Sequence, residues 1–175
     1  HNISIKTIGL SKKLFQEMKT NQFLEAMWSG KVVNITENRQ ALHPALRGSR
    51  DSFFPKDIMN KVLKQKKQML KIAEGVRNGN IKSHSGKKYT SVLAIGIGGS
   101  DLGPRMSVKA LTPFKSNIDV RFVSNIDPSD LINVTADLDP SKTLIIVSSK
   151  TFTTVETLAN AKAAFNWLAK NIGEI

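Results

Sequence analysis

Three short apolar segments recur in the second half of the chain and limit the folds it can adopt. They span residues 92–97, 120–123 and 143–147, and each is followed by a segment with residues typical of a helix start. The first and third are apolar almost throughout, which is typical of strands covered on both faces. Strands that alternate with helices form parallel sheets. We therefore predict an α/β fold with a parallel sheet between helices.

Helical patterns dominate the first half of the chain. One helix is predicted from about Leu10 to Met27, with buried positions at Leu14, Met18, Phe23 and Met27, and a second near residues 57–76. The passage between them has no convincing periodicity, and loop-forming residues lie just before position 87. We predict an N-terminal helical region over residues 1–86 and an α/β domain over residues 87–175.

The last helix has the clearest sequence signals. Thr153-Thr154-Val155-Glu156 has the spacing of a capping box. The apolar residues beyond it predict a buried stripe made of Leu158, Ala161, Phe165 and Leu168.

A glycine-rich loop, Gly96-Ile97-Gly98-Gly99-Ser100-Asp101-Leu102-Gly103-Pro104, follows the first apolar segment. Glycines let a backbone approach an anion closely and adopt positive φ. Ser100 adds a hydroxyl at the start of a helix, where free N–H groups and the helix dipole favour negative charge. The loop is therefore a candidate anion site. A plain strand-to-helix turn, in which the glycines serve packing alone, is the alternative interpretation.

Two nucleotide-binding motifs do not fit this loop. In a dinucleotide fingerprint that starts at Gly96, the third glycine position is Asp101, and in one that starts at Gly98, the second is Ser100. A Walker A loop needs a Gly-Lys-Ser/Thr ending that is missing from the sequence here.

A second loop, residues 148–154, follows the third apolar segment and reads Ser-Ser-Lys-Thr-Phe-Thr-Thr. It offers five hydroxyls and the ammonium of Lys150, the donor set that a phosphate monoester requires. Alternatively, the hydroxyls cap the following helix and Lys150 is solvated, and Thr153 can serve both roles. Ligands bind outside the carboxyl ends of parallel strands, so we favour a phosphate loop.

Other candidate chemistry is sparse. The sequence has no cysteine, and its three histidines, His1, His43 and His84, lack ligand spacing, so no metal site is predicted. Three aspartates near the strand ends could face a sugar, although helix capping is their commoner role: Asp101, Asp127 and Asp130. No pair of carboxylates and no Ser-His-Asp set suitable for catalysis can be assembled from the sequence.

The net charge of +12 raises the question of nucleic-acid binding. The first 90 residues carry the whole excess, with 18 Lys and Arg against 6 Asp and Glu, much of it on the helix near 61–71. Few aromatic residues accompany these lysines, so a solvated helix face is the favoured interpretation. Apolar stretches are too short for a membrane helix, and no signal peptide is recognisable, so we expect a cytoplasmic protein.

Several motifs, in the same order along the chain, closely resemble the glucose-6-phosphate isomerase family. They are the glycine loop at 96–104, the upstream segments 34–39 and 42–47, Phe122-Val123-Ser124-Asn125-Ile126-Asp127 and Ser149-Lys150-Thr151-Phe152-Thr153-Thr154-Val155-Glu156-Thr157. The resemblance extends from about Trp28 to Trp167.

The resemblance implies a fold of the sugar isomerase (SIS) type, of which this chain supplies the N-terminal helices and about three strands of the first domain. It implies aldose–ketose interconversion of glucose 6-phosphate and fructose 6-phosphate without a cofactor, in a homodimer. It places the catalytic residues outside this fragment. The substrate-binding residues that it implies are Gly99, Ser100, Ser149, Lys150, Thr151, Phe152, Thr153 and Thr154. A non-catalytic SIS-type module that binds phosphosugars is the alternative, and a nucleic-acid binder ranks third.

Overall fold

The computed structural model describes residues 3–48, 53–114 and 117–172. The chain forms two compact units, residues 1–70 and 71–175, and the division falls inside helix α3. The helices and strands are α1 (Ile5–Glu17), α2 (Thr20–Trp28), β1 (Val32–Asn34), β2 (Arg39–Gln40), α3 (Lys56–Asn78), β3 (Ser91–Ile95), α4 (Gly99–Ala110), β4 (Asp119–Val123), α5 (Pro128–Thr135), β5 (Thr143–Val147) and α6 (Val155–Ile172), with short 3-10 turns at Ala45–Arg47, Thr112–Phe114 and Pro140–Lys142.

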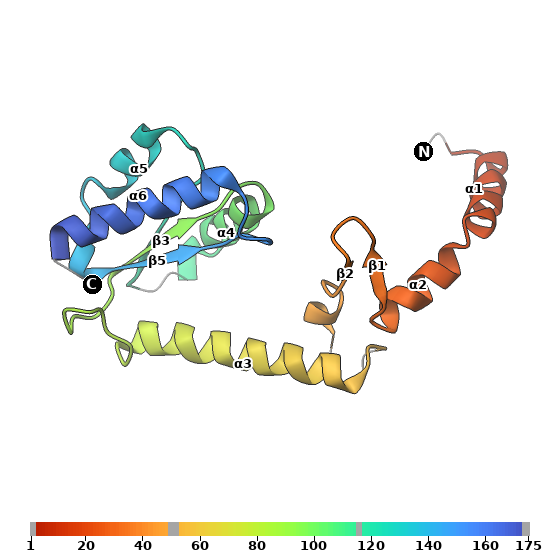
Figure 1. Ribbon diagram of the computed structural model, residues 1–175, viewed down its shortest axis with the longest axis horizontal. Coiled ribbons are helices and arrows are strands. Elements are labelled where there is room, and N and C mark those ends of the chain that lie inside the picture. Colours follow the sequence, from red (N-terminus) through yellow and green to blue (C-terminus); the bar gives the residue numbers. More distant parts are fainter. Residues whose placement is uncertain (1–2, 49–52, 115–116, 173–175) are drawn as a thin grey trace. The chain divides into compact units, whose positions relative to one another are not determined.

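The second unit contains a three-stranded parallel sheet in the order β4-β3-β5. Both neighbours are in register with the central strand, so that Leu93 lies opposite Arg121 on one side and Ile145 on the other. The predicted α/β fold, with a parallel sheet between helices, is confirmed. Because the strands are parallel, their carboxyl ends share one edge of the sheet, from which the loops to α4, α5 and α6 depart (Figure 1).

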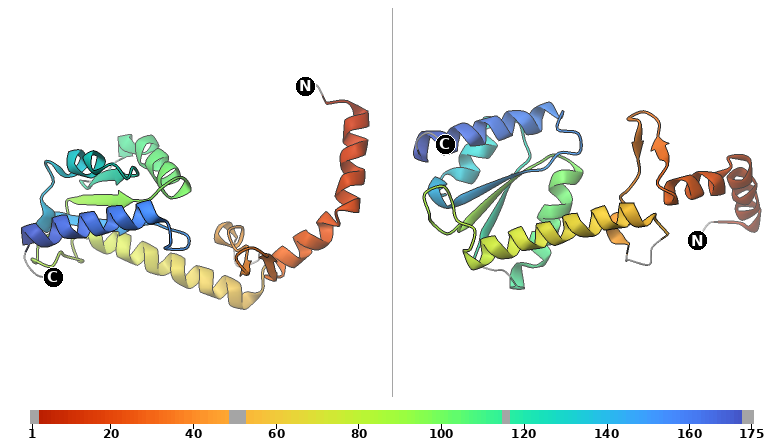
Figure 2. Two further views of the ribbon diagram at one scale, coloured as in Figure 1. Left: turned by 45° about the horizontal axis from the view of Figure 1, so that its top comes forward. Right: turned by 60° about the horizontal axis from the view of Figure 1, so that its bottom comes forward.

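Helices cover both faces of this sheet. On one face α5 and α6 lie together, and Leu93, Ile95 and Val123 form a buried core with Leu131 of α5 and Ala164 of α6. Side chains alternate along a strand, so Phe122 must point to the other face. There the Arg105 guanidinium of α4 lies 5.0 Å from the centre of the Phe122 ring. The strands therefore lie between α4 and the α5–α6 pair (Figure 2).

The buried face of α6 differs from the predicted stripe. Leu158 and Phe165 are 42% and 53% exposed, so their predicted burial is wrong for the described chain. The buried residues are instead Thr157, Asn160 and Ala164. Of these, Ala164 packs in the core with residues of β3 and β4, and the Asn160 side-chain amide donates to the Asn125 carbonyl. The helix begins at Val155, so Thr154 occupies the cap position, one residue later than the capping-box spacing predicts.

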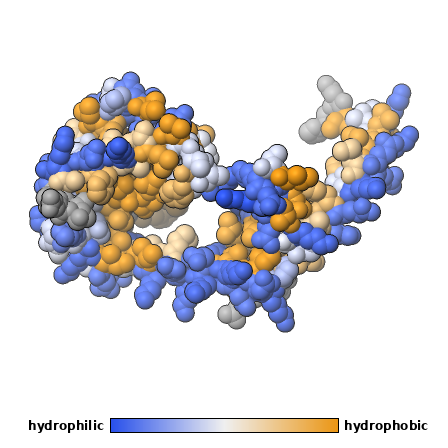
Figure 3. All heavy atoms as spheres, viewed as in Figure 1, coloured by the Kyte–Doolittle hydropathy of each residue, from blue (hydrophilic) through white to orange (hydrophobic). Residues whose placement is uncertain are grey.

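The first unit opens with two helices where one was predicted. Lys19 adopts a left-handed conformation with φ of 51° and separates α1 from α2. The predicted burial of Leu14, Met18 and Phe23 is also wrong, because all three are more than half exposed. Every residue of α1 is exposed, so no packing contact selects a single continuous helix. Figure 3 shows hydrophobic residues at the surface of this part of the chain beside hydrophilic ones.

A small hairpin, β1–β2, lies in the passage for which the sequence predicted no regular structure. Val32 pairs with Gln40, and Asn38 takes a left-handed conformation in the turn. The Asn34 carboxamide accepts hydrogen bonds from the Thr36 hydroxyl at 2.9 Å and the Glu37 amide at 3.3 Å, which fixes the turn. The strands are too short to show alternation, which explains why they were missed. Nearby, the start of α3 contributes to a core of Ala45, Phe54, Ile58, Met59 and Val62.

Candidate functional site

The glycine loop connects the central strand β3 to helix α4. The strand ends at Ile95, two residues earlier than predicted, because residues 96–98 form the turn into the helix. The Gly96 amide still reaches across to the Val123 carbonyl at 3.3 Å. Gly98 is the N-cap residue, with φ of 60° and ψ of −121°, a conformation that residues with a side chain rarely adopt.

Three glycines of this loop have different structural roles. A Cβ atom at Gly96 would lie 2.9 Å from both the Cβ and the carbonyl oxygen of Ser100, so packing requires glycine there. Backbone conformation requires it at Gly98. Neither reason applies to Gly99, which is exposed and whose Cβ atom would have no neighbour within 4 Å in the described structure. An open position of this kind suits the close approach of a ligand to the backbone.

Ser100 follows Gly99 in the first turn of α4 and is half-buried. Its amide donates to the Ile97 carbonyl at 3.2 Å, and the Leu102 amide donates to the Gly98 carbonyl at 2.8 Å. These bonds hold the first turn in a fixed position against the strand end. The positive end of a 12-residue helix therefore faces the space beside Gly99.

The hydroxyl-rich loop follows β5, the neighbour of β3. The Ser148 amide donates to the Ile95 carbonyl at 2.8 Å, which extends the strand pairing up to the loop. Phe152 has φ of 55°, and its amide donates to the Ser149 hydroxyl at 3.1 Å. The Thr151 and Thr153 hydroxyls are 2.6 Å apart. The loop is thus a compact turn whose own hydroxyls shape it, and Lys150 is exposed on it.

The two loops therefore depart from adjacent parallel strands at one edge of the sheet. Gly99 and Ser100 lie at the start of α4, and the residues from Ser149 to Thr154 immediately precede α6. Hydroxyls, an ammonium group and the N-termini of two helices are brought to this edge. Such an arrangement can bind a dianion such as a phosphate monoester.

The aspartates near the strand ends have structural partners. Asp127 caps α5, and the hydroxyl and amide of Ser129 hold the pKa of its carboxyl below the usual range. Asp130 accepts hydrogen bonds from two backbone amides. Asp101 is buried and paired with Arg105. Arg105 was not singled out from the sequence, although its spacing of four residues from Asp101 is a signal for such a pair.

The described residues provide neither a metal site nor a membrane-spanning helix. Within residues 3–48, 53–114 and 117–172, no group of His, Asp and Glu is arranged to hold a metal ion, and His1 lies outside these residues. None of the described helices has the length and apolar content needed to cross a bilayer.

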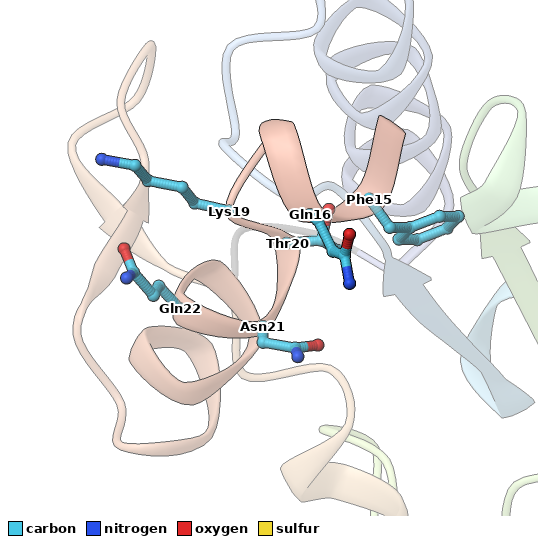
Figure 4. Close-up of a pocket in the computed structure, with 6 residues that line it drawn as sticks. All are labelled: Phe15, Gln16, Lys19, Thr20, Asn21 and Gln22. Atoms are coloured by element: carbon cyan, nitrogen blue, oxygen red, sulfur yellow. The ribbon is translucent and has the colours of Figure 1, made fainter. Parts of the chain in front are cut away.

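An open pocket lies at the junction of α1 and α2 and shares no residue with the two loops (Figure 4). Phe15 and Lys19 point away from one another there, and the remaining side chains are neutral and polar. It therefore lacks the cluster of anion-binding groups found at the strand ends.

Comparison with known proteins points to one family. Residues 2–174 match the family model for phosphoglucose isomerase. A glucose-6-phosphate isomerase from Frankia casuarinae is 44% identical over 99% of this chain and 32% of its own length. One from Caulobacter sp. (strain K31) is 48% identical over 85% of this chain and 28% of its own length. The chain thus spans about a third of these relatives.

A solved structure gives the same result. The crystal structure of a glucose-6-phosphate isomerase from Chlamydia trachomatis superposes with a TM-score of 0.73 at 27% identity, over 100% of this chain and 34% of that chain. The similarity includes both units of the chain.

Proposed function

The chain belongs to the phosphoglucose isomerase family, and we propose that it is the amino-terminal portion of a glucose-6-phosphate isomerase, in which it binds the substrate's phosphate. The whole enzyme interconverts glucose 6-phosphate and fructose 6-phosphate. It opens the sugar ring and then moves a proton between C2 and C1 through an enediol, by general acid–base catalysis without a metal or organic cofactor.

The role of this chain in that reaction is to position the sugar. The phosphate is remote from the carbons that react, and binding energy gained there orients the substrate for proton transfer. Lys150 supplies the compensating positive charge, and the helix N-termini and hydroxyls supply further donors. The residues that we assign to this site are Gly99, Ser100, Ser149, Lys150, Thr151, Phe152, Thr153 and Thr154.

The open position at Gly99 is the observation that carries this proposal. Gly99 needs neither positive φ nor extra space for neighbouring protein atoms, yet it lies at a helix N-terminus beside Ser100. A sugar phosphate that approaches the backbone at this point explains why a side chain is absent. The hydroxyl loop after the adjacent strand completes the set of donors.

Gly99→Ala tests the proposal in the full-length protein that contains this sequence. An added methyl group at a close contact with ligand should cost about 1–3 kcal/mol of binding, or roughly fivefold to 150-fold in affinity for glucose 6-phosphate. Gly9→Ala is the control, because Gly9 also lies in a helix with open space at its Cβ position but belongs to α1 and to neither loop. Calorimetric titration should show weaker binding for the first variant alone, while neither variant loses thermal stability. Equal affinities in the two variants would contradict the proposal.

Further features of the full-length protein are proposed on the basis of the family. We propose that the SIS domain begins at residue 87, after the N-terminal helical region of residues 1–86. We also propose that the protein is a cytoplasmic homodimer that acts in glycolysis and gluconeogenesis, and that it binds neither nucleic acid nor membranes.

A further inference from the structure

Asp101 and Arg105 form an ion pair at the first turn of α4. The Asp101 side chain is 6% exposed, and its Oδ1 accepts hydrogen bonds from Arg105 Nη2 at 2.8 Å and Nε at 3.1 Å. The Nε atom also lies 3.1 Å from Oδ2. Asp101 directly follows Ser100, so this pair links Arg105 to the turn that carries one half of the proposed phosphate site.

Arg105 also joins this turn to the loop after β4. Its Nη2 atom donates to the Ser124 hydroxyl at 3.3 Å, while its guanidinium lies over the Phe122 ring. The backbone amides of Ser124 and Asn125 both donate to the Asp130 carboxylate, at 3.1 and 3.0 Å. The loop after β4 is therefore held in place from its own helix as well as from α4.

The same loop is linked to α6 on the opposite face of the sheet. Asn160 is 4% exposed, and its side-chain amide donates to the Asn125 carbonyl at 2.8 Å. Asn160 lies in the second turn of α6, which begins directly after the hydroxyl loop. A continuous set of hydrogen bonds therefore runs from α4 through Ser124 and Asn125 to α6. It connects the helices that follow the two proposed phosphate loops.

We propose that Arg105 and Asn160 are positioning residues that fix the separation of the glycine loop and the hydroxyl loop through the loop after β4. This inference rests on the proposed function, because the two loops must bind one phosphate together. Neither residue belongs to the set assigned to direct contact with substrate. Small displacements of binding groups can change rates or affinities by large factors, so a fixed separation matters.

The test uses the full-length protein and calorimetric titration of inorganic phosphate and of glucose 6-phosphate. Asn160→Ala and the double variant Asp101→Asn/Arg105→Gln should each weaken binding of both ligands about tenfold. The double variant removes both charges, so no buried carboxylate is left unpaired. Each change is also combined with Lys150→Ala. If positioning acts through placement of Lys150, the combined loss will be smaller than the product of the separate losses.

Arg121→Gln is the control for a merely structural effect. Arg121 forms an ion pair with Asp137, whose carboxylate is far more exposed than that of Asp101, and its described hydrogen-bond partners lie in neither loop. It should lower thermal stability and leave phosphate affinity within about twofold. The inference would be overturned if Asn160→Ala and the double variant both bound the ligands with wild-type affinity. It would also be overturned if their losses of affinity simply multiplied with the loss caused by Lys150→Ala. If Gly99→Ala and Lys150→Ala themselves leave binding unchanged, the proposed function fails instead, and the positioning roles fail with it.

Discussion

Gly96 lies so close to Ser100 that a Cβ atom at residue 96 would be 2.9 Å from the Ser100 carbonyl oxygen. The obstructing atom belongs to the backbone of α4, so it cannot move without moving the helix start. Gly96→Ala should therefore destabilise the protein by about 1–3 kcal/mol, the usual cost of overpacking a tight site. Urea unfolding of the variant measures this loss.

Gly9→Ala provides the comparison, because Gly9 lies inside helix α1 with no neighbour within 4 Å of its Cβ position, and alanine there should stabilise by roughly 0.5–1 kcal/mol. Opposite signs for the two substitutions are expected. A Gly96→Ala variant as stable as Gly9→Ala would show that the helix does not approach the strand end so closely.

Lys150→Ala tests the charge at the phosphate site. Hydrogen bonds to an ionised group contribute about 1.5–3 kcal/mol, so its loss should weaken glucose 6-phosphate binding roughly tenfold to a hundredfold. Binding of unphosphorylated glucose should change much less. Ser100→Ala should cost on the order of 1 kcal/mol, because water can partly replace a neutral hydroxyl.

Lys162→Ala is the matched control for this charge, because Lys162 is an exposed lysine on α6 outside the loop. Its substitution should leave phosphate affinity within about twofold, as is usual for surface charges. Calorimetry on the three variants decides the assignment. If Lys150→Ala behaved like Lys162→Ala while folding normally, Lys150 would be a solvated residue at a helix start.

The sheet could be predicted from the sequence because its signals are local. The apolar segments at 143–147 and 120–123 match β5 and β4 to within one residue. The buried faces of the helices were harder to predict, since the burial of a side chain depends on packing partners that periodicity does not identify. Phe165 fits an apolar stripe but is exposed, while Asn160 and Thr157 occupy the inner face.

The candidate site was predictable in part for a similar reason. Glycine and hydroxyl groups at strand ends are visible in the sequence, and the parallel topology brings both loops to one edge. The link from Arg105 to Ser124 joins residues 19 positions apart, and that from Asn160 to Asn125 spans 35 positions. Such contacts are determined by tertiary structure, so no local pattern indicates them.

The ion pair between Arg121 and Asp137 should make stability depend on pH in the acid range. The Arg121 guanidinium lowers the pKa of Asp137 from 3.8 to about 2. A carboxyl whose pKa is lowered by folding stabilises the native state above its unfolded pKa and loses that contribution as the pH falls through the folded one. Wild type should therefore exceed Asp137→Asn in stability at neutral pH, and the difference should disappear between pH 3.8 and about 2.

Chemical denaturation across this pH range measures the difference. The same comparison in an Arg121→Gln background is the control, since the carboxyl then lacks the partner that lowers its pKa. The pH dependence of the difference should be largely absent there. If it persisted unchanged, the cause would have to lie in groups other than Arg121.

The 175-residue chain produced alone should not isomerise glucose 6-phosphate. The carboxylates nearest the strand ends already have structural partners: Asp101 pairs with Arg105, Asp127 caps α5, and Asp130 accepts two amides. None of these three is therefore free to remove the C2 proton as a general base. Exchange of that proton with deuterium from solvent, followed by NMR, is a sensitive measurement of proton removal. No exchange above the rate without protein is expected.

A trace of isomerase from the expression host is the main source of a false positive, and Lys150→Ala identifies it. Contaminating enzyme would give the same exchange rate in preparations of both chains, because the substitution affects only this sequence. Activity that belongs to the chain would fall in the variant, since the phosphate would be held less tightly. Exchange that is present in the wild-type chain and lost in Lys150→Ala would contradict the prediction. It would mean that a base within these 175 residues reaches the sugar.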